Sequence, residues 1–129
     1  MTDSKPRQRA DLRHVLGREG EDYAVGYLRA QNMVVVERNW RCREGEIDII
    51  AFDELNDTLV IVEVKTRRTT TFGSPVEAVT RAKAARLRHL AYAWMREHPV
   101  GVTGVRIDVL GILMRSGETP SVEHVRDVW

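Results

Sequence analysis

The spacing of apolar residues changes several times along the chain, and each change predicts a new element. Apolar positions that recur every three or four residues predict two helices, one over 16–31 and one that ends near 97. Runs of β-branched residues predict strands. Strands are expected at 33–40, on both arms of a hairpin within 45–65, at 105–114 and, as a weaker edge strand, at 122–128.

The helix boundaries carry more specific signals. Asn32 is a candidate left-handed stop for the first helix. The second helix has two candidate starts: a capping box with proline at the first helical position, over 74–77, and a cap at Thr80 that would start the helix near Arg81. Its expected buried positions share one face: Ala84, Leu87, Leu90, Ala91 and Trp94.

The hairpin contains charged residues where a buried strand should have none. Residues 59–64 are apolar on both faces, which predicts a central strand buried on both sides. Glu63 and Lys65 lie on one face of that strand, and Asp48 interrupts the apolar partner strand. A buried charge requires compensation. Two carboxylates and a lysine on adjacent strands therefore predict a site for a hard cation, with the lysine as a charged side chain that assists it.

A third acid is a candidate for the same site. Glu21 shares a helical face with Ala24, Val25 and Leu28, a stripe that is expected to pack on the sheet. Glu21 is then either an acid directed toward the site or a first-turn acid that the helix dipole favours. The spacing does not separate these two interpretations.

Length and composition restrict the number of domains, the class of protein and the compartment. A chain of 129 residues supports one core, and 43% apolar with 30% charged residues is ordinary for a globular protein. A single cysteine, Cys42, excludes an intramolecular disulfide and fits a reducing compartment. The expected domain spans 14–129, after a flexible basic arm over 1–13. Neither a signal peptide nor a membrane span is expected, which favours a cytoplasmic protein.

The distribution of charge is more informative than the net charge of +1. Seven acids and no Lys or Arg fall within 44–63, whereas seven bases and one acid fall within 65–88. An acidic patch beside a basic one suits a metal site next to a phosphate-binding surface. The alternative is two solvated charged faces.

Several of these residues together resemble a known family. Asp48, followed in the next strand by Glu63-Val64-Lys65, is similar to the core of the PD-(D/E)XK nucleases. The wider ordered set resembles the YraN-like family of predicted nucleases, which is related to Holliday junction resolvases, and covers the chain from about residue 17. That set comprises Gly20-Glu21, Ala24, Leu28, Arg38-Asn39, Gly45-Glu46-Ile47-Asp48, Glu63-Val64-Lys65-Thr66-Arg67, Phe72-Gly73, Lys83 and Arg106-Ile107-Asp108-Val109. One departure is Ile47 in place of the proline before the first aspartate.

The resemblance implies a fold and a mechanism. The fold is α/β and restriction-endonuclease-like: a mixed sheet of about five strands, with the first helix on one face and the long helix packed against it. Asp48, Glu63 and the Val64 carbonyl would hold Mg²⁺ or Mn²⁺. Lys65 would orient or deprotonate the attacking water or stabilise charge at phosphorus, and Glu21 would join the site.

The resemblance also implies a partner. Arg67, Arg68, Lys83 and Arg86 would bind backbone phosphates of DNA, with branched or junction DNA among the candidate substrates. Junction resolvases act as dimers, so a homodimer is a further expectation. Two other interpretations remain: Asp48, Glu63 and Lys65 form a buried ion-pair network, or the chain is a nuclease-like binding module without turnover.

Overall fold

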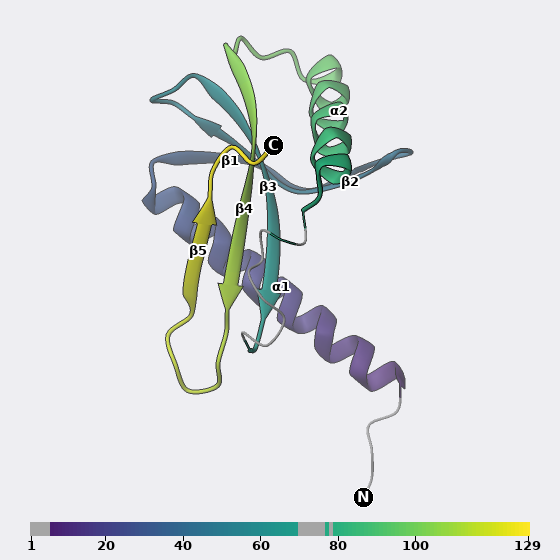
Figure 1. The fold of residues 1–129 in the computed structure, drawn as a ribbon, viewed down its shortest axis with the longest axis vertical. Helices are drawn as coiled ribbons and strands as arrows, with labels where there is room; N and C mark the ends of the chain where they lie inside the picture. The colour runs from purple at the N-terminus through teal and green to yellow at the C-terminus, as the bar shows by residue number, and fades with distance from the viewer. Residues whose placement is uncertain (1–5, 70–76, 78) are drawn as a thin grey trace, which may run out of the picture.

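A computed structural model describes residues 6–69, 77 and 79–129, with backbone only for residues 6–14. Two helices and five strands follow one another along the chain (Figure 1). Their bounds are α1 Pro6–Ala30, β1 Met33–Cys42, β2 Gly45–Asp53, β3 Thr58–Arg67, α2 Arg81–Glu97, β4 Gly104–Leu113 and β5 Ser121–Val125. The hairpin predicted within 45–65 is confirmed as β2 and β3.

The strands form one open mixed sheet in the order β1-β2-β3-β4-β5. All neighbours are antiparallel except β3 and β4, which are parallel and pair from Thr58–Gly104 to Arg67–Leu113. The parallel pair requires a crossover, and α2 supplies it. The expected central strand is β3 and the expected edge strand is β5, so both predictions are confirmed.

The two helices cover opposite faces of this sheet (Figure 1). On one face, Ala24 and Leu28 of α1 pack with Val62 and other residues of the sheet. On the other, the five apolar positions predicted for α2 are all buried, and they pack with Leu59 and Ile61 of β3. Because β3 is covered on both faces, it has the continuous apolar character of a buried strand. The predicted mixed α/β sheet flanked by helices, an arrangement consistent with the restriction-endonuclease-like fold, is confirmed.

Several element boundaries differ from the sequence prediction, most of them by one to three residues. α1 begins at Pro6 and not at the expected residue 16, so residues 6–13 of the expected arm are helical. A proline at the first helical position followed by good helix formers explains this extension. β3 continues to Arg67, because β4 pairs with it to its end.

The start of α2 is the second of the two predicted alternatives. Thr80 is the N-cap, and its hydroxyl accepts a hydrogen bond from the backbone N–H of Lys83. Asn32 adopts a φ of 65° just after α1, as a left-handed stop should. The capping box over 74–77, the Phe72-Gly73 pair and most of the polar loop after β3 lie outside the described residues. No helix of the described chain combines the length and apolar character needed to cross a bilayer.

Candidate active site

The candidate site lies where β2 and β3 separate. Their ladder runs from Asp53–Thr58 to Ile49–Val62 and ends there, after which β2 continues beside β1 and β3 beside β4. Asp48 and Glu63 are the next residues on the two strands. The backbone N–H of Val64 donates to Asp48 Oδ2 at 2.9 Å. A side-chain contact thus replaces the strand ladder at the fork, which leaves space between the strands for the two carboxylates.

The backbone of β2 also turns at Asp48. Residues two apart in a regular strand share a face, but Ile47 packs in the α2-side core whereas Ile49 packs in the α1-side core. Asp48 lies at the change of face, so its side chain can point into the fork instead of into either core. This explains how a carboxylate is accommodated between two fully buried isoleucines.

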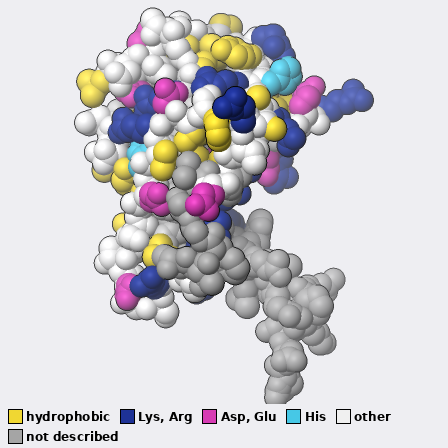
Figure 2. Space-filling view, viewed as in Figure 1, with side chains coloured by type: hydrophobic (Ala, Val, Ile, Leu, Met, Phe, Trp, Pro, Cys, Tyr) yellow, Lys and Arg dark blue, Asp and Glu magenta, His cyan; other side chains and the backbone are white. Residues whose placement is uncertain are grey.

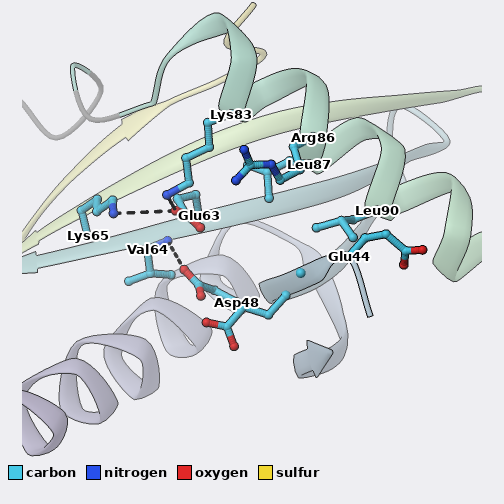
Figure 3. Close-up of a pocket in the computed structure, with 11 residues that line it drawn as sticks. Glu44, Asp48, Glu63, Val64, Lys65, Lys83, Arg86, Leu87 and Leu90 are labelled. Carbon is cyan, nitrogen blue, oxygen red and sulfur yellow. Dashed lines mark hydrogen bonds and ion pairs between the residues drawn. The ribbon is translucent and has the colours of Figure 1, made fainter. Parts of the chain in front are cut away.

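Glu63 is paired with two lysines from different elements. Its side chain is 8% exposed, and its Oε2 atom lies 3.7 Å from Lys65 Nζ on the same strand. The same oxygen forms an ion pair with Lys83 Nζ, which reaches down from α2 (Figure 3). Burial lowers the pKa of the Lys83 amine, but the hydrogen bond and charge of Glu63 outweigh burial, so that pKa is raised overall. Lys83 therefore remains a cation in this site.

Asp48 has the most perturbed acidity of the site. Its burial, and next the negative charge of Glu63, raise the pKa of the Asp48 carboxyl to about 7. The Val64 N–H opposes this shift, and the more distant charge of Glu21 adds to it. Within the described residues Asp48 forms no ion pair. The two lysines therefore compensate Glu63 directly, whereas Asp48 interacts with the Lys83 charge without forming an ion pair with it.

Two hollows meet at the fork. The first, of about 370 Å³, is lined from α2 by Lys83 and Arg86 and from the sheet by Asp48, Glu63 and Lys65 (Figure 3). The second, of about 670 Å³, opens on the α1 side. Asp48 and Val64 line both hollows. Asp48 is thus accessible from either side of the sheet's fork, whereas Glu63 lines the first hollow only.

Glu21 lines the second hollow, and the packing of α1 places it there. A Cβ at Gly20 would lie 1.9 Å from Thr66 Oγ1, so only glycine permits this close approach of α1 to β3. Glu21 Oε1 then accepts hydrogen bonds from Asn39 Nδ2 at 2.8 Å and from Arg38 Nε at 3.1 Å. Its stripe packs on the sheet as predicted.

The carboxylates of the site do not form a larger cluster. Among the described residues, no group of three or more His, Cys, Asp or Glu side chains is close enough to hold a metal ion. Glu21 lines the second hollow together with Asp48, but Glu21, Asp48 and Glu63 do not form such a group. Asp48 and Glu63, with hard oxygen donors, are the pair that fits a cation, and such a cation would need water and substrate oxygens to complete its shell.

The four bases predicted to bind phosphates do not lie together. Lys83 and Arg86 line the first hollow. Arg67 is half-buried at the last position of β3, and Arg68 lines a separate hollow beside Met114. The periodicity of α2 placed the first pair beside the fork, whereas the bend of the chain after β3 carries Arg68 away from it.

Sequence reasoning did not find the partners of Glu21 or a buried ionic network on the α1 side. Asp53 Oδ2 pairs with Arg106 Nη1 at 2.8 Å, Arg106 Nε pairs with Asp108 at 3.0 Å, and Asp108 contacts His124 Nε2 at 2.8 Å. His124 Nδ1 and the Tyr27 hydroxyl complete the chain at 3.0 Å. The alternation of Arg106 and Asp108 within an apolar strand was the available signal.

Comparison with known proteins places the chain among relatives. The model of a family described as uncharacterised protein family UPF0102 matches residues 20–112. A protein of Arthrobacter sp. (strain FB24) is 53% identical over 114 residues, covering 88% of this chain and 95% of the relative. A protein of Acidothermus cellulolyticus is 49% identical, covering 91% and 95%, and one of Clavibacter michiganensis is 54% identical, covering 86% and 92%.

All three relatives carry the name UPF0102 protein, which states no activity. The relation to PD-(D/E)XK nucleases stays a prediction that rests on the residues at the fork. The family match spans both arms of that fork and the helix that supplies Lys83. With a matching family model and relatives about half identical over most of its length, the chain belongs to the uncharacterised protein family UPF0102.

Proposed function

We propose that the protein is a metal-dependent nuclease that hydrolyses phosphodiester bonds in DNA. The observation that carries this proposal is the fork of β2 and β3, where Asp48 and Glu63 meet with Lys65 beside them. A sheet does not place two acids at its centre for stability, because their desolvation and mutual repulsion both oppose folding. Such a cost is typical of functional sites.

The residues fit a hard divalent cation. Asp48 lacks an ion pair among the described residues, and the raised pKa of its carboxyl reflects charge that a cation would neutralise. Asp48 and Glu63 would hold Mg²⁺ or Mn²⁺, with the Val64 carbonyl as the further ligand that the resemblance implies. When bound, the ion would lower the pKa of a water and neutralise phosphate charge.

The surrounding cations suit a phosphodiester. Lys65 would orient the attacking water or stabilise the negative charge that develops at phosphorus. Lys83 and Arg86 line the same hollow from α2 and would hold the phosphates on either side of the scissile one. Hydrolysis adds water across one phosphorus–oxygen bond, so the chain needs to supply only positioning, charge and proton transfer.

A cleavage panel tests the proposal. Labelled branched, single-stranded and duplex DNA would be incubated with wild type in Mg²⁺, Mn²⁺ or EDTA. We expect metal-dependent cleavage that Asp48→Asn and Glu63→Gln each abolish, while DNA binding is unchanged or tighter because negative charge is lost. Asp57→Asn, which keeps a residue that tolerates the left-handed φ of 49° in the β2–β3 turn, is the matched control. Cleavage by the double variant at the wild-type rate would refute the assignment.

One observation favours the binding module without turnover. Two lysines already neutralise Glu63, and no cluster of three acids surrounds the fork among the described residues. A module of this kind would bind DNA through Lys83 and Arg86 but would not need a metal. Calorimetric titration with Mn²⁺ separates the two functions: binding that Asp48→Asn removes supports the nuclease, and DNA binding without any Mn²⁺ binding supports the module.

A further inference from the structure

Trp129 differs from the other tryptophans of the chain. Trp40 and Trp94 are 8% and 1% exposed, whereas Trp129 is 59% exposed. Its ring is nevertheless held in place. The indole Nε1–H donates to the Val79 carbonyl at 2.8 Å, and the Trp129 carbonyl accepts from Arg88 Nη2 at 3.2 Å. One hydrogen bond holds the ring and the other holds the backbone of the same residue, so the exposed ring is preorganised to contact something else.

A cation and a hollow adjoin this ring. The guanidinium carbon of Arg81 lies 4.9 Å from the ring centroid of Trp129, within the range of a cation–π contact. A hollow of about 600 Å³ is lined by Arg81 and Trp129 together with Glu77, Val79, Thr80 and Val128. Figure 2 shows hydrophobic, basic and acidic side chains intermingled on the upper part of the molecule, where the C-terminus lies in Figure 1.

The ring lies beside the first residue of the helix that carries two bases of the candidate site. Arg81 is the first residue of α2, and Lys83, which pairs with Glu63, is less than one helical turn further on. Arg86 follows within the next turn. Arg81 lies about 200° around the helix from Lys83, so a strand held by its phosphates at Lys83 and Arg86 would reach the Trp129 ring by crossing the N-terminal end of α2.

We propose that Trp129 and Arg81 form a stacking site for an unpaired nucleobase of the strand whose phosphates lie at Lys83 and Arg86. This inference rests on the proposed function for the presence of that strand. An indole ring accepts the face of any base, and a guanidinium nearby strengthens such stacking. A paired base in a duplex offers no free face, so the site selects single-stranded or frayed DNA over intact duplex.

The family match does not predict this feature. The matched residues end at 112, whereas Trp129 and the Val128 that anchors it lie beyond that range.

The experiment uses the full chain in EDTA, so that binding is measured without cleavage. Oligothymidylate of 20 nucleotides and a duplex of the same length would be titrated, with fluorescence anisotropy reporting total binding and intrinsic tryptophan emission reporting stacking. Only Trp129 has an exposed ring among the three, so stacking should quench its emission alone. Trp129→Ala removes the ring, Trp129→Phe restores an aromatic face, and Tyr92→Ala removes an exposed aromatic elsewhere on α2.

We expect oligothymidylate to quench the emission of wild type. Trp129→Ala should bind it about 5- to 150-fold more weakly, the equivalent of one lost base stack. Duplex affinity should change less than twofold, Trp129→Phe should recover most of the loss, and Tyr92→Ala should behave as wild type. The proposal would be overturned if Trp129→Ala weakened single-stranded and duplex binding equally. It would also be overturned if wild type bound free thymidine monophosphate as tightly as oligothymidylate.

The outcome also separates this inference from the proposed function. If DNA binds without quenching and Trp129→Ala binds it as wild type does, the stacking site is refuted while cleavage through Asp48 is unaffected. If oligothymidylate quenches Trp129 but no metal supports cleavage, the stacking site stands and the nuclease assignment fails.

Discussion

Asp48→Asn should stabilise the metal-free protein at pH 8. The charged Asp48 carboxylate is desolvated and faces Glu63, and for these reasons its pKa is raised to about 7. Asparagine removes the charge but keeps an oxygen that can accept the Val64 N–H, and its amide can donate toward Glu63. It therefore resembles the protonated aspartic acid that the site favours.

The sign and size of this stability change follow from the linkage between proton binding and folding. The Asp48 pKa rises from 3.8 to about 7 on folding, so the folded state holds a proton more tightly than the unfolded chain does. The contribution of Asp48 to stability is then greatest below pH 4, falls as the pH rises from 4 to 7, and stays low above pH 7. A shift of this size corresponds to at most about 4 kcal/mol at pH 8, and coupling to Glu63 reduces what one substitution recovers to about 1–4 kcal/mol.

The assay is urea unfolding and thermal unfolding of wild type and Asp48→Asn in EDTA at pH 5 and pH 8. At pH 8 each kcal/mol should raise the Tm by about 4 °C for a chain of this size. At pH 5 the folded wild type is already protonated at Asp48, so the advantage of asparagine should shrink by more than half.

Asp53→Asn is the matched control on the same strand. Burial raises the pKa of the Asp53 carboxyl, but hydrogen bonds from Asn56 and Arg106 outweigh it and lower that pKa to about 2. Asparagine should therefore destabilise the protein at this position. If Asp48→Asn were destabilising at pH 8, or if its effect were the same at pH 5, the buried charge of Asp48 beside Glu63 would not be the source of the instability.

Three further predictions concern the site and its support. Millimolar Mn²⁺ should raise the Tm of wild type but not of Asp48→Ala, because a ligand that binds only the folded state stabilises it, and an equal rise in both would indicate binding elsewhere. Gly20→Ala should lower stability by about 1–3 kcal/mol in urea unfolding, and Thr66→Ala should restore much of that loss because it removes the atoms that clash. Lys83→Ala and Arg86→Ala should each weaken duplex binding similarly for all sequences and reduce the slope of log affinity against log salt by about 0.9, whereas an unchanged slope would place the phosphates elsewhere.

The sequence predicted the fold well where local pattern and tertiary environment agree. Residues 59–64 are apolar on both sides, and the strand they form is covered by a helix on each face. The early start of α1 was missed because the polar residues after Pro6 have good helix propensity but no apolar periodicity, which was the signal used. The choice between two starts of α2 needed the hydrogen bond of the Thr80 hydroxyl, which no spacing reveals.

The site was predictable only in part. Asp48, Glu63 and Lys65 could be found because charge inside an apolar strand is unusual, and their strands are adjacent along the chain. The ion pair of Lys83 with Glu63 depends on how α2 lies across the sheet, and hydrophobic periodicity gives the buried face of a helix but not its tilt or height. The contact between Trp129 and Arg81 depends on the path of the chain after β5, which follows no periodic pattern.

The parallel pairing of β3 with β4 has a consequence for the order of folding. α1 and the first three strands make contacts between neighbours along the chain, whereas β3 and β4 meet only after a long segment that includes α2 has closed on itself. Closure of such a segment costs chain entropy before its contacts form, which slows that step. The two carboxylates can thus be brought together early by a local hairpin, and the lysine from α2 arrives with the late crossover. Before the crossover forms, Asp48 and Glu63 face one another without the positive charge of Lys83. The slow step of folding is therefore also the step that brings Lys83 to its ion pair with Glu63.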